Sequence, residues 1–140
     1  MTEINKNIYN DGTYLHNNTN WHREDSKWKA KEVEKIIKKN NLNIQDFSEI
    51  GCGAGEILNS LSSRFEGAKF VGYEVSEDAY NLSKQINNKK INFFLKDILE
   101  ENIYHELLLC LDVFEHVSDY MGFLEKIKNK SKYKIFHIPL

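Results

Sequence analysis

Apolar residues occur along this chain in two alternating patterns. Short runs rich in Leu, Ile, Val and Phe are typical of strands, and they predict strands over residues 47–50, 68–74, 91–95, 106–112 and 133–138. Between these runs, apolar residues return every three or four positions, as they do on one face of a helix. This spacing predicts helices over residues 25–40, 55–65 and 118–130, and a further helix capped by Ser76.

The run from Leu107 to Leu111 is entirely apolar, which is typical of a strand with both faces covered. Strands that alternate with helices at this spacing form right-handed βαβ units, and such units build a parallel sheet. The sequence therefore predicts an α/β fold, a Rossmann-like parallel sheet of about five strands with helices on both faces.

The chain has 140 residues, which suits one domain, and we expect residues 25–140 to form it. Residues 1–24 are polar but aromatic-rich, so we expect an N-terminal arm that packs on the domain as a lid over a site. The sequence ends at Leu140, directly after the last predicted strand, and this leaves an unpaired sheet edge. We expect either a shortened version of a larger fold or association of copies through that edge.

Composition excludes several kinds of partner. The chain has 21 acidic and 19 basic residues and a net charge of −2, which argues against nucleic acid as the main partner. No apolar run reaches the roughly 18 residues of a membrane span, and the polar N-terminus lacks a signal-peptide core, so we expect a cytoplasmic protein without membrane contact. Two cysteines and five histidines show no metal-ligand spacing, and we predict no metal.

The glycine-rich turn after the first predicted strand is the most informative segment. Gly51, Gly53 and Gly55 follow that strand directly and precede a helix. Glycine accepts a positive φ and has no Cβ, so backbone here can approach a flat, polar cofactor closely. In an open parallel sheet, ligands bind beyond the carboxyl ends of the strands, where the strand order reverses. We therefore predict a ligand site at this turn.

Three other strand ends carry residues that suit a nucleoside ligand. Glu74 ends the second strand, and its carboxylate suits the two hydroxyls of a ribose. After the third strand, Asp97 suits an adenine amino group and Ile98 the face of the ring. After the fourth, Asp112 and Phe114 lie near the reactive end of the ligand. Structural alternatives stay open: a solvated strand-end acid at 74, a helix cap at 97 and a turn-closing residue at 112.

Glu56 helps to decide between a dinucleotide and a ligand without phosphate groups. It occupies the sixth position of the glycine motif, where a dinucleotide site has glycine or alanine. A carboxylate at a helix start disfavours a diphosphate, which such a helix end otherwise attracts. S-adenosylmethionine (SAM) suits the site better, because it has an adenosine, a positive charge and no phosphate. An NAD-dependent oxidoreductase is the weaker alternative.

Four segments in order resemble the class I SAM-dependent methyltransferases: residues 49–55, 70–76, 96–98 and 111–117. The last is similar to the Asp-x-x-Glu-His-Val element of one large branch of that family. The family usually has seven strands, the last two forming an antiparallel pair, and this pair is missing from the present sequence. The resemblance implies roles for residues around the turn, namely Gly51, Gly53 and Gly55 lining the methionine and ribose, Glu49 orienting the amino group, and Tyr73 and Val75 beside the adenosine. Cys52, within the turn, is a further candidate cofactor-binding residue, and its small size also suits a filler role.

We therefore expect a SAM-dependent methyltransferase that acts on a small-molecule acceptor, an oxygen of a sugar or metabolite. The protein's main tasks would be to position the acceptor and to remove its proton. His116 and His137 are the candidate catalytic residues, although His116 also suits a loop-ordering role. Lys29 is a candidate partner for the cofactor carboxylate. The alternative is a non-catalytic cofactor-binding module that needs a partner chain.

Overall fold

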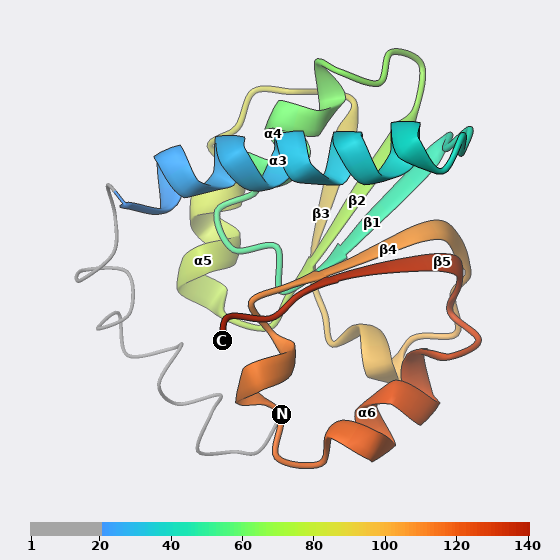
Figure 1. The fold of residues 1–140 in the computed structure, drawn as a ribbon. Coiled ribbons are helices and arrows are strands. Elements are labelled where there is room, and N and C mark those ends of the chain that lie inside the picture. Colours follow the sequence, from blue (N-terminus) through green and yellow to red (C-terminus); the bar gives the residue numbers. More distant parts are fainter. Residues whose placement is uncertain (1–20) are drawn as a thin grey trace.

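One parallel sheet of five strands organises the fold (Figure 1). The computed structural model describes the backbone of residues 21–140 and the side chains from residue 25 onward. The strand order is β3-β2-β1-β4-β5, so the direction in which strands are added reverses between β1 and β4. The strands are β1 (Asp46–Ile50), β2 (Lys69–Glu74), β3 (Ile91–Leu95), β4 (His105–Leu111) and β5 (Ser131–His137).

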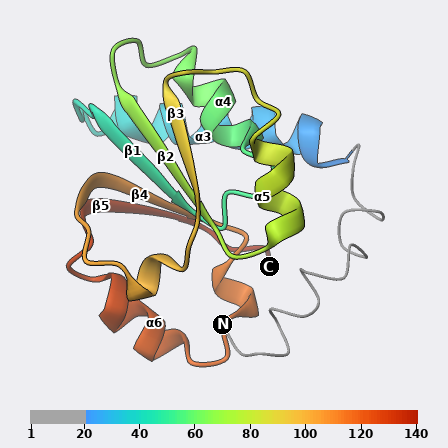
Figure 2. The same ribbon diagram turned by 180° about the vertical axis from the view of Figure 1, so that it is seen from behind.

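Helices cover both faces of this sheet, as predicted (Figures 1 and 2). On one face lie α3 (Trp21–Lys39), α4 (Glu56–Ser62) and α5 (Glu77–Ser83); on the other lie α6 (Tyr120–Ile127) and the 3₁₀ turn η1 (Ile98–Glu100). A second 3₁₀ turn, η2 (Phe114–His116), follows β4. The α/β, Rossmann-like prediction is thereby confirmed.

The first helix begins earlier than predicted, at Trp21 rather than residue 25. It ends at Lys39, where Asn41 takes a positive φ of 52° that stops the helix. The remaining part of the predicted arm, residues 1–20, and the lid role assigned to it lie outside the described residues.

Two hydrophobic clusters lie on opposite faces of the sheet, because successive side chains of a strand alternate in direction. Leu107 and Leu109 of β4 pack with residues of α3 and α4, while Leu108 and Cys110 pack with residues of α6. All four are at most 1% exposed, so the apolar run is covered on both faces, as its composition predicted.

The helical spacing of Tyr120, Phe123, Leu124 and Ile127 predicts that all four face the sheet from α6, and this prediction is partly wrong. Phe123 and Ile127 are buried, but Tyr120 is 54% exposed. The helix begins only at Tyr120, after Asp119 caps it by accepting a 3.0 Å hydrogen bond from the amide of Gly122. Tyr120 is therefore in the first turn, and its ring lies edge-on to that of Phe114, with ring centroids 6.0 Å apart.

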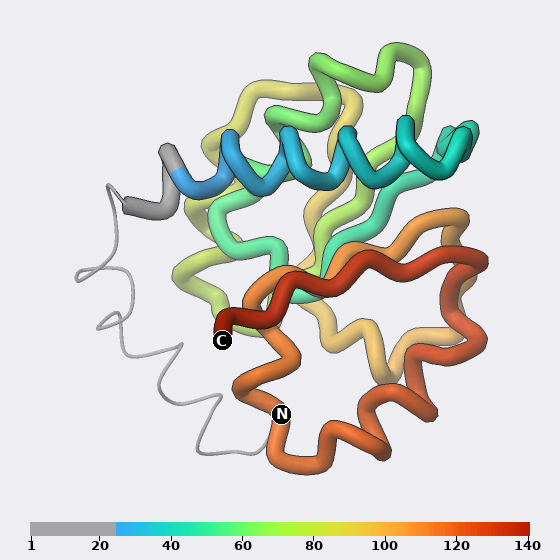
Figure 3. Tube along the Cα trace, in the orientation of Figure 1, coloured from blue at the N-terminus to red at the C-terminus, as the bar shows by residue number. Residues whose placement is uncertain are grey.

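The carboxyl ends of β4 and β5 lie side by side (Figure 3). Leu111 pairs with His137, so the last residue of β5 stands next to the end of β4. No strand of residues 21–140 pairs with the outer side of β5. Within the same range, no helix is both long and apolar enough to cross a membrane.

Candidate functional site

The glycine turn borders open space at the point where the strand order reverses. Gly51 and Gly53 have φ values of 61° and 56°, which glycine adopts without strain. A Cβ on Gly53 would meet no atom within 4 Å, so the backbone here faces a gap. A Cβ on Gly51 would lie 2.8 Å from Cγ2 of Val113, so the turn packs directly on the loop after β4. The ends of β1 and β4 therefore form the two sides of the site.

Gly55 and Cys52 have packing roles within this turn. A Cβ on Gly55 would lie 2.4 Å from the Phe93 ring, which leaves no room for a side chain there. Cys52 is 6% exposed, and its sulfur packs against Gly72. A Cβ added to Gly72 would lie 2.7 Å from that sulfur. Of the three turn glycines, Gly53 is thus the one whose Cα faces open space.

Glu74 connects the end of β2 to the turn. Its carboxylate accepts three hydrogen bonds of 2.8 Å, from the amides of Gly53, Val75 and Ser76. The side chain is only 7% exposed. Amide donors on both carboxylate oxygens hold its charge in a fixed position beside the gap.

Glu49 is a buried carboxyl group that lacks a complete set of partners. It lies on β1 and is 2% exposed, and its Oε2 has no hydrogen-bond partner among the described residues. Burial and the nearby charge of Glu74 raise the pKa of Glu49 well above 4.5, and the positive charge of Lys29 opposes this shift. A buried acceptor without a donor is costly, so this site suits a ligand that brings a cationic donor.

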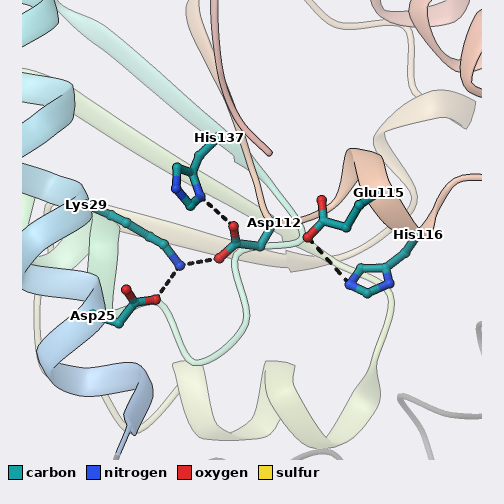
Figure 4. A network of polar contacts seen from close by, with 6 residues as sticks. All are labelled: Asp25, Lys29, Asp112, Glu115, His116 and His137. Carbon is teal, nitrogen blue, oxygen red and sulfur yellow. Dashed lines mark hydrogen bonds and ion pairs between the residues drawn. The ribbon is translucent and has the colours of Figure 1, made fainter. Parts of the chain in front are cut away.

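Lys29 lies at the centre of a polar network that joins α3 to the ends of β4 and β5 (Figure 4). Its side chain is 7% exposed, and its ammonium forms ion pairs with Asp25 and Asp112. On its other oxygen, Asp112 bonds Nδ1 of His137 over 2.6 Å. Burial would raise the pKa of Asp112, but the hydrogen bonds from Lys29 and His137 outweigh this effect and lower it below 3.8.

The backbone of Asp112 is held in an uncommon conformation. Its φ is 56°, in the left-handed region that few residues other than glycine adopt. Its amide donates a 3.0 Å hydrogen bond to the carbonyl of His137, which fixes this turn against β5. Strained residues of this kind cluster at functional sites, where the surrounding structure holds them.

The two predicted catalytic histidines differ in their surroundings. His137 is bound to Asp112, whereas His116 stands in η2 with its Nε2 3.6 Å from Oε1 of Glu115. In the view of Figure 4, the Glu115–His116 pair lies on the other side of Asp112 from Lys29. His116 is about half exposed, at 46%. The two side chains thus do not form one cluster.

The remaining predicted residues lie at the adenine side and in the core. Asp97 caps η1, accepting a 3.0 Å hydrogen bond from the amide of Leu99, which is the structural alternative for this position. Ile98 is 1% exposed inside the α6-side cluster, and Tyr73 is 5% exposed with its hydroxyl 2.9 Å from Nε2 of His105. Neither side chain presents accessible surface to a ligand. Phe114 packs edge-on against the rings of Tyr120, Phe123 and Phe136.

Asp25 is a site residue that sequence reasoning missed. Its spacing of four residues from Lys29 on one helix is the signal that predicts such an ion pair. Among the side chains described, those of residues 25–140, no group of three or more His, Cys, Asp or Glu is arranged to hold a metal ion.

A family model described as a methyltransferase domain matches residues 48–132. The ubiquinone biosynthesis O-methyltransferase of Rickettsia typhi is 30% identical over 100 residues, which cover 66% of this chain and 41% of that protein. The enzyme of the same name from Rickettsia bellii is 26% identical over 106 residues, 73% of this chain and 44% of its own length. The chain thus spans less than half the length of these curated relatives.

Solved structures show the same fold at lower identity. The plantazolicin methyltransferase BpumL in complex with SAH matches with a TM-score of 0.67 and 20% identity, covering 93% of this chain and 50% of that one. The magnesium protoporphyrin IX methyltransferase of Synechocystis PCC 6803 with bound SAH matches with a TM-score of 0.63 and 18% identity. The match covers 75% of this chain and 51% of that one. At these identities the likeness shows the fold alone.

Proposed function

Because this chain belongs to the methyltransferase domain family, we propose that it transfers the methyl group of SAM to a hydroxyl oxygen of a small-molecule acceptor. The names of the curated relatives, which are O-methyltransferases, support oxygen as the acceptor atom. The SAH in the solved neighbours supports SAM as the methyl donor. A sugar or another hydroxylated metabolite is the acceptor class we propose.

The observation that carries the proposal is the buried carboxyl group of Glu49 beside the glycine turn. SAM is a cation with an α-ammonium group, and Oε2 of Glu49 is a buried acceptor without a donor among the described residues. Glu74 would bind the ribose hydroxyls from its fixed position, and Gly53 would let the backbone approach the ligand. Asp97 and Val75 would lie at the adenosine end, each close to a strand terminus.

When bound, SAM supplies an electrophilic methyl group, so the protein's tasks are to bind, orient and deprotonate the acceptor. The carboxylates of the site suit the positive charges of the donor. Glu56, at the start of α4, lies where the diphosphate of NAD would have to bind. Its negative charge would repel that diphosphate, so the site disfavours NAD.

Calorimetric titration with SAH and with an SAH analogue that lacks the α-amino group tests the proposal. We expect SAH to bind the wild type about 10- to 100-fold more tightly than the analogue, because a hydrogen bond to a charged group contributes about 1.5–3 kcal/mol. Glu49→Gln should reduce this difference, whereas Glu125→Gln, an exposed carboxyl on α6, should leave it unchanged. Folded wild-type protein that binds neither SAM nor SAH would remove the proposal.

A second candidate is a cofactor-binding module without turnover of its own. The edge position of β5 favours it, because no strand of residues 21–140 pairs with its outer side and a partner chain could bind there. The outer edge of β5 would pair with that partner or with a second copy. Cofactor binding without methyl transfer to broad acceptor pools, together with a dimer by light scattering, would support this second candidate.

A further inference from the structure

We propose that Asp112 and His137 form a catalytic dyad that removes the acceptor proton, and that Lys29 positions Asp112 for this task. The inference rests on the proposed methyl transfer and names its base. Asp112, expected from the sequence to be a cofactor neighbour, takes the orienting role instead. The three residues come from the turn after β4, from the end of β5 and from α3, and they meet at the carboxyl ends of the strands.

The hydrogen bond from His137 to Asp112 decides which imidazole nitrogen is the base. An ionised carboxylate only accepts hydrogen bonds, so Nδ1 must carry the hydrogen in the 2.6 Å contact with Oδ1. In a neutral imidazole the other nitrogen, Nε2, then has a free lone pair. Figure 4 shows this second nitrogen on the side of the ring turned away from Asp112. A carboxylate that orients a histidine in this way is the general arrangement of a base and its positioning group.

Ion pairs hold the carboxylate partner of His137 in place. Two carboxylates, Asp25 and Asp112, share the single ammonium of Lys29, so Asp112 is fixed on one oxygen by Lys29 and on the other by His137. The groups that face His137 are Asp112 at the end of β4 and Lys29 with Asp25 on α3, and the aromatic ring of Trp28 packs against it.

The imidazole of His137 is partly exposed to solvent, so an acceptor molecule could reach it. The side chain of His137 is 37% exposed, at the end of β5. Trp28 on α3 packs edge-on against it, with ring centroids 5.9 Å apart, which restricts its orientation. Val113, the residue after Asp112, contacts the glycine turn, so the dyad directly adjoins the proposed cofactor site.

The proton and electrons balance in a single displacement. Nε2 of His137 takes the hydroxyl proton while the acceptor oxygen bonds the methyl carbon, and the electron pair of the broken carbon–sulfur bond stays on sulfur. The products are the methylated acceptor, SAH and a protonated His137, which returns its proton to solvent.

Two readouts test the dyad. Nitrogen-15 NMR of histidine-labelled protein, with His137→Gln to assign its signals, should show His137 with hydrogen on Nδ1 and a bare Nε2. Asp112→Asn should abolish that preference, and Lys29→Met should weaken it. Hydrogen on Nε2 of neutral His137 in the wild type would overturn the proposal, whatever acceptors are found.

The second readout is methyl transfer from tritiated SAM to catechol and to glycerol as acceptor probes. We expect His137→Gln and Asp112→Asn to slow transfer about 100-fold or more. SAM affinity should stay within about threefold of wild type in His137→Gln. Lys132→Gln, an exposed change on β5, should alter neither quantity.

The outcomes separate the two proposals. Absence of SAM binding to the wild type would remove the proposed function itself. Intact binding, with transfer lost in His116→Gln but kept in His137→Gln, would assign the base to η2 and overturn the dyad alone. If neither probe accepts a methyl group, the NMR result decides.

Discussion

The carboxylate of Glu74, at the end of β2, accepts a 2.8 Å hydrogen bond from the main-chain amide of Gly53, in the turn after β1. This bond ties the ends of two neighbouring strands together at the edge of the proposed cofactor site. Because the same carboxylate also accepts from the amides of Val75 and Ser76, its position is set by the fold before any ligand binds. Binding then does not require the side chain to be ordered first.

Glu74→Gln should weaken SAM binding at least tenfold, which corresponds to about 1.4 kcal/mol. A glutamine presents only one acceptor oxygen, and its amide nitrogen would face a main-chain donor. Calorimetric titration measures the change, with Glu125→Gln on the exposed surface of α6 as the matched control. Unchanged affinity in a correctly folded Glu74→Gln protein would contradict the role of this carboxylate.

Gly53→Ala should mainly lower SAM affinity, whereas Gly55→Ala should mainly lower stability. Both residues have a positive φ, so each substitution carries a backbone cost of about 1–2 kcal/mol. At Gly55 the new Cβ would also collide with the Phe93 ring at 2.4 Å, so Gly55→Ala should be the more destabilising of the two in urea unfolding. At Gly53 the Cβ enters open space, so Gly53→Ala should mainly reduce SAM affinity. Equal losses of stability and equal affinities would show that the two glycines do not differ in role.

Much of the fold could be predicted from the sequence, because most of the strands hold several apolar residues within a short stretch. The third strand has the predicted bounds, Ile91–Leu95. The fifth begins at Ser131, earlier than predicted, because it continues to pair with β4 through a lysine-rich stretch that lacks an apolar signal. The two 3₁₀ turns were missed, since three residues are too few to show a periodicity.

The site could be predicted only where it consists of strand ends. The glycine turn and Glu74 follow directly from the order of strands and helices. The pairing of Lys29 with Asp112 joins residues 83 positions apart, and it depends on how α3 packs on the sheet, which no local pattern encodes. The left-handed backbone conformation of Asp112 could not be predicted either, because nothing in the neighbouring sequence marks this position.

Glu49 should make the unfolding free energy depend on pH. Its pKa in the folded protein lies well above the ordinary value of 4.5, so the folded state binds this proton more tightly than the unfolded state. The stabilisation is therefore complete below about pH 4.5 and is lost as pH rises through the folded pKa. Glu49→Gln should remove this decline and unfold at a temperature at least about 3 °C higher than wild type at pH 8. Parallel melting curves of the two proteins between pH 5 and pH 8 would contradict the assignment.

Tyr73→Phe should destabilise the protein without affecting SAM binding. The hydroxyl of Tyr73 lies 2.9 Å from Nε2 of His105, whose Nδ1 in turn lies 3.0 Å from Asp46. Removing it leaves a buried ring nitrogen without this partner, at a cost of about 1–3 kcal/mol. Urea unfolding measures this cost, and calorimetry measures the affinity. A tenfold loss of affinity at unchanged stability would instead support the contact with adenosine that the family resemblance implies.

Lys29→Met should destabilise the protein by about 2–3 kcal/mol near neutral pH, because two carboxylates lose their shared, buried cation. The pKa of Lys29 is raised above 10.5, since its hydrogen bonds to Asp112 and Asp25 outweigh the opposing effect of burial, so its contribution is complete below about pH 10.5 and is lost above the folded value. The pKa of Asp112 is lowered from 3.8, so its contribution is present above about pH 3.8 and is lost as pH falls through the folded value.

The difference in unfolding free energy between wild type and Lys29→Met should therefore be constant from about pH 5 to pH 9 and should shrink at both ends of the range. Urea unfolding at pH 3, 7 and 11 measures it. Lys31→Met, an exposed change on the same helix, should stay within about 0.5 kcal/mol of wild type throughout. A loss in Lys29→Met that persists unchanged at pH 3 would mean that Lys29 stabilises the protein through the packing of its aliphatic stem, and the ion pair with Asp112 would then have no energetic role.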